Sequence, residues 1–404
     1  VAQILSAEPH PQADRLRVCR VEIAPGSQAE VVCGAPNARA GLVGVFAPLG
    51  TFIPGSGITL EKKPVRGVVS NGMLCSEAEL ELSGDHDGII DLPAEMAAHV
   101  GKRYVDVMGL DDPMLHIKIT PNRPDALGVR GVARDLAAAG LGKLKPEPKG
   151  FEGKGAFKNP ISIALEFDKD AANACPCFAG RTIKGVKNAP SPAWLQRRLK
   201  AIGLRPINTL VDITNYITFD RGRPLHVYDA DKLTGTIRAR LAKPGEKFLA
   251  LDNREYSADP ANCVIADDAA VLGFGGIMGG AGTGCSETTV NVLIESAYFD
   301  PVRTGNTGRK HAIQSDARYR FERGIDPKSC MAGANLAAKM ILDLCGGEAS
   351  ELTVAGQEPD PKLTIAFDTS RIEKLTALKV EPDRARTILQ TLGFAIEGAG
   401  AKFQ

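Results

Sequence analysis

The sequence lacks paired cysteine motifs and long apolar runs, and it has few aromatic residues. Its nine cysteines are scattered without a CxxC pair, and Cys175-Pro176-Cys177 is one residue short of the common zinc-knuckle spacing. No stretch approaches the roughly 18 apolar residues of a membrane-spanning helix. Aromatic residues make up 5% of the chain, which argues against base stacking on single strands as its main activity. We therefore expect reduced, partly buried thiols in a cytoplasmic protein with no membrane contact.

Histidine and net charge are also low. The six histidines are never paired at ligand spacing, so no metal site is predicted. The net charge of +1 excludes a strongly basic nucleic-acid binder but permits a local basic surface. Residues 171–211 contain seven Lys or Arg and no acidic residue. Further candidate nucleic-acid contacts are Lys62, Lys63, Arg66, Arg303, Arg309, Lys310, Arg318, Arg320 and Arg323. Where acidic residues lie among these positions, the alternative is that the basic side chains form ion pairs within the protein.

A length of 404 residues predicts two to four domains, and the pattern along the chain predicts a multidomain α+β protein. Residues 1–110 contain short β-branched runs with frequent turns, which favours a small β-barrel of the OB-fold type. Residues 111–150 predict a strand at 114–120, a helix ending at Gly140 and a Pro/Gly/Lys-rich linker at 143–157. Residues 151–355 predict mixed α+β structure, with a helix capped by Ser191-Pro192 and another at 331–345.

The last segment, 362–404, predicts two helices and a strand, the plan of a helix-turn-helix or winged module. The second strand of its hairpin would lie beyond Gln404, and the chain begins with Val1 as though inside a strand. We therefore expect the sequence to be part of a longer protein.

The most informative stretch is RPINTLVDITNYITFDRGRPLHVYDADKL at 205–233. It places polar side chains at close spacing in an otherwise apolar run, namely Asn208, Asp212, Asn215, His226 and Asp229. Packing alone does not require so many hydrogen-bonding groups. Two more blocks of this kind follow, LGFGGIMGG at 272–280 and RKHAIQSDARYRFERGIDP at 309–327. Together they predict a polar pocket built on Gly-rich turns.

Several of these blocks carry a resemblance to a known family. HPQADRL (10–16), VVCGAPN (31–37) and SNGMLCSEAEL (70–80) resemble the tRNA-binding OB domain of several aminoacyl-tRNA synthetases. ITPNRPDALGVRGVARDLAA (119–138), the 205–233 stretch, FGGIMGG and SDARYRFERGID resemble the β subunit of bacterial phenylalanyl-tRNA synthetase. The resemblance follows the family's domain order, and it implies a β subunit without its first strand region and its C-terminal half.

The resemblance implies that the central α+β domain is an editing site, which hydrolyses tyrosine wrongly esterified to phenylalanine tRNA. Glu295 matches the family residue that accepts the tyrosine hydroxyl, Gly279 a backbone contact to the same hydroxyl, and Ala317 the small residue that leaves room for the ring. His226 matches a histidine near the ester. With Asn215 and Ser315, which stands where many members have Thr, it is expected to position the ester and a water rather than form a covalent intermediate.

The resemblance also implies partners and cofactors outside this sequence. We expect binding to phenylalanine tRNA and assembly with an α subunit into an α2β2 heterotetramer. ATP and magnesium are expected only in the complete ligase, with none bound by this chain. Two alternatives stay open: a non-catalytic tRNA-binding scaffold with a vestigial pocket, and an unrelated RNA-binding protein containing an OB-fold, which fits 1–110 but not 205–327.

Overall fold

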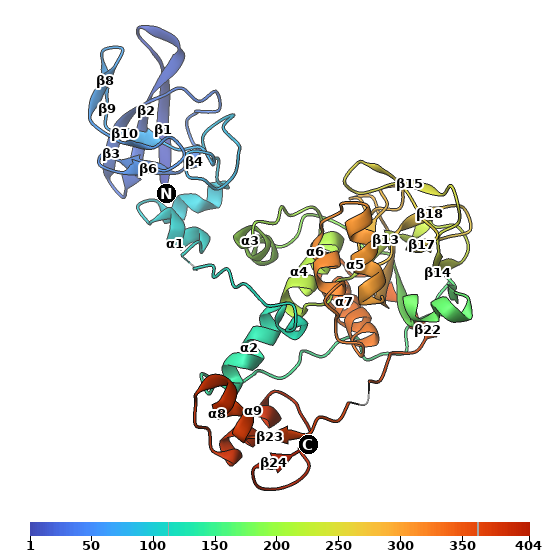
Figure 1. Ribbon diagram of the computed structural model, residues 1–404. Helices are drawn as coiled ribbons and strands as arrows, with labels where there is room; N and C mark the ends of the chain where they lie inside the picture. Colours follow the sequence, from blue (N-terminus) through green and yellow to red (C-terminus); the bar gives the residue numbers. More distant parts are fainter. Residues whose placement is uncertain (112, 362) are drawn as a thin grey trace. The chain divides into compact units, whose positions relative to one another are not determined.

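The computed structural model describes residues 1–111, 113–361 and 363–404, and it forms two compact units, Val1–Leu115 and His116–Gln404 (Figure 1). The finer division proposed from the sequence, with boundaries at 110, 150, 355 and 362, remains a prediction. Position 362 lies outside the described residues, as does position 112 within the 111–150 segment. No described helix is both long enough and apolar enough to span a bilayer.

The first unit consists of short antiparallel strands followed by two helical turns. Its elements are β1 (Ala2–His10), β2 (Ala13–Ala24), β3 (Ser27–Cys33), β4 (Val43–Gly44), β5 (Phe46–Pro48), β6 (Phe52–Ile53), β7 (Ile58–Thr59), β8 (Lys63–Val65), β9 (Val68–Ser70), β10 (Gly72–Leu74), η1 (Ala94–His99) and α1 (Tyr104–Met108). The two helical turns at its end are absent from the all-β prediction.

The strands of the first unit close into the predicted small barrel. Four strands pair in the order β3-β2-β1-β4, and β10 pairs with β5. The backbone N–H of Asn71 donates to the carbonyl of Glu30, and the N–H of Cys75 donates to Val45, both at 2.9 Å. The β5–β10 pair thereby connects the two ends of the four-stranded sheet. Alternate side chains fill the interior, among them Ile4, Cys19, Val21 and Val31.

The second unit contains two five-stranded sheets and a separate two-stranded pairing of β15 with β16. The first has the order β11-β14-β17-β18-β19, and the second has the order β13-β20-β12-β21, with β22 also paired to β12. The strands are β11 (Ile163–Glu166), β12 (Cys177–Lys184), β13 (His226–Asp229), β14 (Ile237–Leu241), β15 (Lys247–Leu249), β16 (Glu255–Ser257), β17 (Cys263–Ala266), β18 (Val271–Phe274), β19 (Met278–Gly279), β20 (Asn291–Tyr298), β21 (Glu348–Ala349) and β22 (Thr353–Gly356).

Helices cover the face of the second sheet that points away from the first sheet. In Figure 1, α4 and α7 lie together, and both contact this sheet. The helical elements up to residue 345 are η2 (Pro124–Ala126), α2 (Val129–Ala138), η3 (Lys169–Ala174), α3 (Ala193–Ala201), α4 (Thr209–Arg221), η4 (Ala230–Lys232), α5 (Pro301–Lys310), α6 (Asp316–Phe321) and α7 (Cys330–Cys345). The predicted helices at 129–140 and 331–345 are therefore confirmed as α2 and α7.

Strand β20 separates two apolar cores because its side chains alternate between its two faces. Val292 and Ile294 pack with α4 and α7 in one core. Leu293 and Ala297 face the other core, which also contains residues of the first sheet. Glu295 belongs to the same alternating set as Leu293 and Ala297, so a carboxyl group lies on the side of β20 that faces the layer between the sheets.

Residues 363–404 form a small helical element with one two-stranded pairing. It comprises β23 (Phe367–Asp368), α8 (Ser370–Thr376), α9 (Pro382–Thr391) and β24 (Lys402–Phe403), and β23 pairs antiparallel with β24. The two predicted helices are present. The predicted strand near 394–397 is not assigned, although Glu397 and Gln404 exchange two backbone hydrogen bonds there.

Two local predictions were wrong. Residues 114–120 have a strand-like pattern, but they form no strand, and Met114, Leu115 and Ile117 are exposed because no neighbouring strand pairs with this segment. Ser191 does not cap α3, whose N-cap residue is Pro192 without a side-chain hydrogen bond. The Ser191 hydroxyl instead donates to the buried carboxylate of Asp212 at 2.6 Å.

Candidate functional site

A cavity of about 330 Å³ brings together six residues singled out from the sequence. These are Asn215, His226, Gly279, Glu295, Ser315 and Ala317. We call it the Glu295 cavity. Its walls come from α4, β13, the β18–β19 hairpin, β20 and the start of α6, segments that are far apart in the sequence.

Strand pairing places His226, Tyr228 and Glu295 on one face of the second sheet. His226 of β13 lies directly opposite Glu295 of β20 in the antiparallel register. Tyr228 follows His226 by two positions, so its side chain projects from the same face of the strand. The Tyr228 hydroxyl donates a hydrogen bond of 2.5 Å to Glu295 Oε2. The His226 and Tyr228 rings pack edge to face with centroids 4.4 Å apart.

The two oxygens of Glu295 have different environments. Oε2 is held by Tyr228, whereas Oε1 has no hydrogen-bond partner among the described residues and is not enclosed by protein atoms. Only 6% of the residue is exposed. Burial raises the pKa of Glu295 to about 7, while the hydrogen bond from Tyr228 and the charge of Arg223 act in the opposite direction. The cavity therefore presents an acceptor oxygen in largely apolar surroundings.

His226 is held in a tight space beside Gly279. A Cβ atom on Gly279 would lie 2.5 Å from His226 Cε1 and 2.9 Å from Nε2, so a side chain at position 279 would displace the ring. Nε2 is buried and has no hydrogen-bond partner among the described residues. Burial lowers the pKa of His226 to about 4, which keeps the imidazole neutral at pH 7. The ring is then a weak base and cannot donate a proton as a cation.

The other three predicted residues contribute different groups. Asn215 lies on α4, and its side-chain amide makes no hydrogen bond to the described residues, so its donors and acceptor are available. The Ser315 hydroxyl is already engaged, since it donates to the carbonyl of Ile277 at 2.6 Å and accepts from the N–H of Arg318 as the N-cap of α6. Ala317 adds a methyl group to the wall and leaves space beside it.

The polar residues of 205–233 do not form one pocket as predicted, because three of the five have structural roles. Asn208 caps α4 by accepting from the N–H of Val211 at 3.1 Å. Asp212 accepts from Ser191 and from the backbone N–H of Ile207. Asp229 accepts from the hydroxyl of Thr289 at 2.8 Å. Buried polar groups of this kind stabilise the scaffold, and only Asn215 and His226 line the cavity.

The basic residues expected near the pocket do not line it. Arg303 donates to the backbone carbonyl of Ala261 at 2.6 Å, and Lys310 pairs with Asp259 at 2.6 Å. Arg309 donates to the side chain of Asn306 and remains exposed. Arg318 and Arg323 both pair with Glu322, and Arg320 pairs with Asp316 and also donates to the backbone carbonyl of Leu127. The structurally paired alternative therefore describes most of this group.

In the first unit, the predicted basic strip is exposed on the β8–β9 hairpin. Lys62 and Arg66 make no ion pair with the described residues, and Lys63 pairs with Glu61 at 2.8 Å with both side chains in solvent. Surface pairs of this kind contribute little to stability. All three side chains can therefore reach an external anion.

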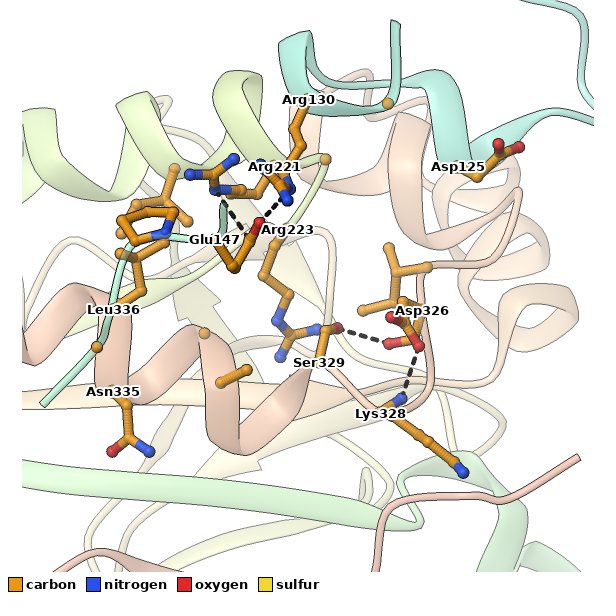
Figure 2. Close-up of a pocket in the computed structure, with 18 of the residues that line it drawn as sticks. Asp125, Arg130, Glu147, Arg221, Arg223, Asp326, Lys328, Ser329, Asn335 and Leu336 are labelled. Carbon is orange, nitrogen blue, oxygen red and sulfur yellow. Dashed lines mark hydrogen bonds and ion pairs between the residues drawn. The ribbon is translucent and has the colours of Figure 1, made fainter. Parts of the chain in front are cut away.

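A second cavity of about 520 Å³ is larger but chemically different. Figure 2 shows Glu147 of the extended 143–157 segment between Arg130 and Arg221, with which it forms ion pairs. Ser329 donates to the backbone carbonyl of Asp326. The two ion pairs of Glu147 hold the extended segment against α2 and α4. We therefore interpret this cavity as a structural contact between the extended segment and the helices, rather than as a binding site.

Tyr228 is the residue of the Glu295 cavity that sequence reasoning missed. The alternation of β13 was available as a signal, because a side chain two positions after His226 shares its face. Among the described residues, no group of three or more His, Cys, Asp or Glu side chains could hold a metal ion.

Comparisons with known proteins agree across most of the chain. Residues 1–101 match the family "Putative tRNA binding domain" and residues 174–346 match the family "B3/4 domain". The "Phenylalanine--tRNA ligase beta subunit" of Cereibacter sphaeroides is 54% identical over 404 residues, which cover 98% of this chain and 50% of the relative. That of Mesorhizobium japonicum is 52% identical over 99% of this chain and 49% of the relative. The chain thus spans about half the length of these relatives.

One solved structure was also matched. It is an N-terminal fragment of the phenylalanyl-tRNA synthetase β subunit from Pyrococcus horikoshii, 17% identical, and the match covers 74% of this chain and 86% of that one. The TM-score of this match is 0.33.

Proposed function

The chain belongs to the family of phenylalanine–tRNA ligase β subunits, and we propose that its second unit hydrolyses tyrosine wrongly esterified to phenylalanine tRNA. The first unit, in this proposal, binds the tRNA through its barrel. The observation that carries the hydrolytic part is the unpaired, accessible Oε1 of the buried Glu295.

A second site is needed because of how tyrosine differs from phenylalanine. An apolar pocket built for phenylalanine rejects an analogue with an added hydroxyl by only about a hundredfold. A site that hydrogen-bonds the hydroxyl discriminates more strongly, because phenylalanine leaves the buried partner unpaired. In the Glu295 cavity a tyrosyl ring would donate its phenolic hydrogen to Glu295 Oε1. Ala317 would leave space beside the ring.

The hydrolytic step that fits this cavity uses a water molecule and no covalent enzyme intermediate. The oxygen of the water attacks the ester carbonyl carbon, the bond to the ribose oxygen breaks, and the ribose oxygen takes up a proton. Tyrosine and tRNA with a free terminal hydroxyl are the products. An aminoacyl ester is already reactive, so orientation of the water supplies much of the required acceleration.

The cavity residues have distinct tasks in this mechanism. Asn215 offers a free amide to the ester or the water. Neutral His226 is a weak base because its pKa is about 4, and only Nδ1 is left to hydrogen-bond the substrate, since Nε2 is buried. Ser315 can offer only a remaining acceptor lone pair, since its hydrogen is donated to Ile277. Its main task is to fix the start of α6, which carries Ala317.

The complete ligase is proposed to contain an α subunit, as two α and two β chains, and to use ATP and magnesium for activation of phenylalanine. No described cluster of residues in this chain has the donor set for a metal ion, so no step of the hydrolysis is assigned to magnesium. Binding of phenylalanine tRNA and a cytoplasmic location belong to the same proposal.

The test is hydrolysis of tyrosyl-tRNA and phenylalanyl-tRNA, both made with phenylalanine tRNA, by the complete ligase and its Glu295→Ala variant. We expect the wild-type protein to release tyrosine and spare phenylalanine. The variant should lose most of the tyrosine release, because no carboxylate receives the phenol. A wild-type protein that releases neither amino acid would instead support a non-catalytic tRNA-binding scaffold.

A further inference from the structure

We propose that Tyr228 is a positioning residue for discrimination between tyrosine and phenylalanine, because it holds Glu295 Oε2 and leaves Oε1 for the hydroxyl of the substrate. This inference rests on the function proposed above, and it identifies a residue that determines the specificity of the proposed hydrolysis. Tyr228 touches Glu295 rather than the reacting ester, so its effect passes through that carboxyl group.

The position of Tyr228 is fixed from three sides. Its backbone belongs to β13, which pairs with β20 over residues 226–229. Its side chain is 2% exposed and packs in the core between the two sheets. The His226 ring lies against it at a centroid separation of 4.4 Å. A phenol held in this way cannot turn away from Glu295 without opening the core.

The hydrogen bond from Tyr228 selects the orientation of the carboxyl group. A glutamate side chain has several rotatable bonds, so its carboxyl group can adopt several orientations. In an apolar cavity it adopts the orientation in which a hydrogen-bond donor is within reach. Tyr228 binds Oε2, and Oε1 is left unpaired and accessible. A carboxylate accepts several hydrogen bonds, so the substrate phenol can bind without displacing Tyr228.

The same bond affects the charge of Glu295. Burial raises its pKa to about 7, and the Tyr228 hydroxyl and Arg223 oppose that rise. The other titratable groups that face it or line the cavity come from several elements: His226 of β13, Cys175 after η3, Cys263 of β17 and Asp316 of α6. His226 is neutral at pH 7. Tyr228 and Arg223 are therefore the groups that favour the carboxylate, which is the stronger acceptor for a phenol.

The experiment compares four forms of the complete ligase, namely wild type, Tyr228→Phe, Glu295→Gln and the double variant. The readout is kcat/KM for hydrolysis of tyrosyl-tRNA and of phenylalanyl-tRNA between pH 5.5 and 8.5, values that bracket the Glu295 titration by about 1.5 units on each side. Tyr228→Phe removes one oxygen atom and keeps the ring, so the core packing is conserved. Thermal unfolding of each variant verifies that it is folded.

Tyr256→Phe is the matched control. Tyr256 also donates its hydroxyl to a carboxylate, Asp252, at 2.7 Å, but Asp252 is exposed and Tyr256 does not line the Glu295 cavity. If loss of any phenol–carboxylate hydrogen bond lowered activity through stability, both variants would behave alike. We expect the selectivity of Tyr256→Phe to equal that of wild type.

Tyr228→Phe is expected to lower the preference for tyrosyl-tRNA over phenylalanyl-tRNA by about tenfold, the effect of one hydrogen bond to a charged group. In the plot of kcat/KM for tyrosyl-tRNA against pH, the fall in activity on the acid side should move to higher pH, because the pKa of Glu295 rises when the Tyr228 hydroxyl is removed. In the Glu295→Gln background the same change should have little further effect, because the two residues act as one unit.

Two results would overturn the assignment of Tyr228 while leaving the proposed function intact. One is unchanged selectivity and pH profile in a folded Tyr228→Phe variant. The other is increased selectivity, which would mean that the Tyr228 hydroxyl competes with the substrate. A wild-type protein without tyrosyl-tRNA hydrolysis would overturn both proposals.

Discussion

Glu295 lies on the inter-sheet side of β20, in the same alternating set as Leu293 and Ala297, where an apolar residue would pack without penalty. Burial of an ionised carboxyl group is costly unless hydrogen bonds compensate for lost water. Tyr228 supplies one such bond, and Oε1 is left without a partner among the described residues. A local violation of core packing of this kind is typical of functional sites.

The stability of the second unit should depend on pH through Glu295. Its pKa is about 7 in the folded chain and near 4.5 when unfolded, so between these values the folded state holds the proton more tightly. Wild-type stability therefore falls as pH rises through this window, by up to about 3 kcal/mol from this group alone. His226 contributes the opposite slope from about pH 4 to 6.5.

Glu295→Gln cannot titrate, but it keeps His226. The free energy of unfolding of this variant, relative to wild type, should therefore increase between pH 4.5 and 7. Urea unfolding of the second unit at several pH values measures the difference. A constant difference across the window would show that Glu295 is not a buried, proton-binding group.

Gly279 should be intolerant of even one methyl group. A Cβ there would come within 2.5 Å of the His226 ring, which is itself packed on Tyr228. We expect Gly279→Ala to destabilise the second unit by about 1–3 kcal/mol and to reduce tyrosyl-tRNA hydrolysis. Gly282→Ala is the control, since nothing lies within 4 Å of a Cβ at that position. Equal behaviour of the two variants in unfolding and hydrolysis assays would contradict this account.

The start of α6 depends on one hydroxyl. Ser315 caps the helix through Arg318 and joins it to the β18–β19 hairpin through Ile277. Ser315→Ala should cost about 1–2 kcal/mol of unfolding free energy and raise KM for tyrosyl-tRNA, because Ala317 lies on this helix. Ser315→Thr keeps the hydroxyl and should retain both properties. Loss of activity in Ser315→Ala with normal stability would point to a direct role of the hydroxyl in the chemistry.

The β8–β9 hairpin of the first unit carries the predicted basic strip. Replacement of Lys62, Lys63 and Arg66 by Gln should weaken binding of phenylalanine tRNA. The slope of log K against log salt should become shallower by about 2, since each lost phosphate contact removes close to one unit. Filter binding at several salt concentrations measures both effects. An unchanged slope would place the tRNA contact on another surface.

Helices and strands whose sequences contain both the periodic apolar pattern and the residues that end the element could be predicted from the sequence. The α7 region has helical apolar spacing and ends at Gly346, and the strands around 17–23 and 290–296 are rich in β-branched residues. The segment 114–120 has the same kind of pattern but no pairing strand, and pairing is a non-local property. Ser191 likewise precedes a helix, yet Asp212 on α4 offers it a stronger acceptor.

The candidate site was predictable only in part, and for a related reason. The family resemblance pointed to His226, Glu295 and Ala317 individually, but the register between β13 and β20 is what places them together. Tyr228 was missed because its importance arises from a contact with Glu295 across that register. Asp212 was misread because an acidic residue in a helix gives no local sign of the buried hydroxyl that it binds.

The two units have separate cores, one within the barrel and others around the two sheets of the second unit. The separation is compatible with the two proposed functions, which are binding of tRNA by the barrel and discrimination of the amino acid in the Glu295 cavity. The chain spans about half the length of its curated relatives. The activation of phenylalanine is accordingly assigned, as a proposal, to the complete ligase.

The most direct test of the central claim is a crystal structure of the protein with a non-hydrolysable tyrosyl-adenosine analogue. We predict that the phenolic oxygen binds Glu295 Oε1 at about 2.5–3.0 Å, with Tyr228 still on Oε2 and the ester mimic beside Asn215 and His226. A tyrosyl ring found elsewhere, or bound with its hydroxyl away from Glu295, would contradict the account.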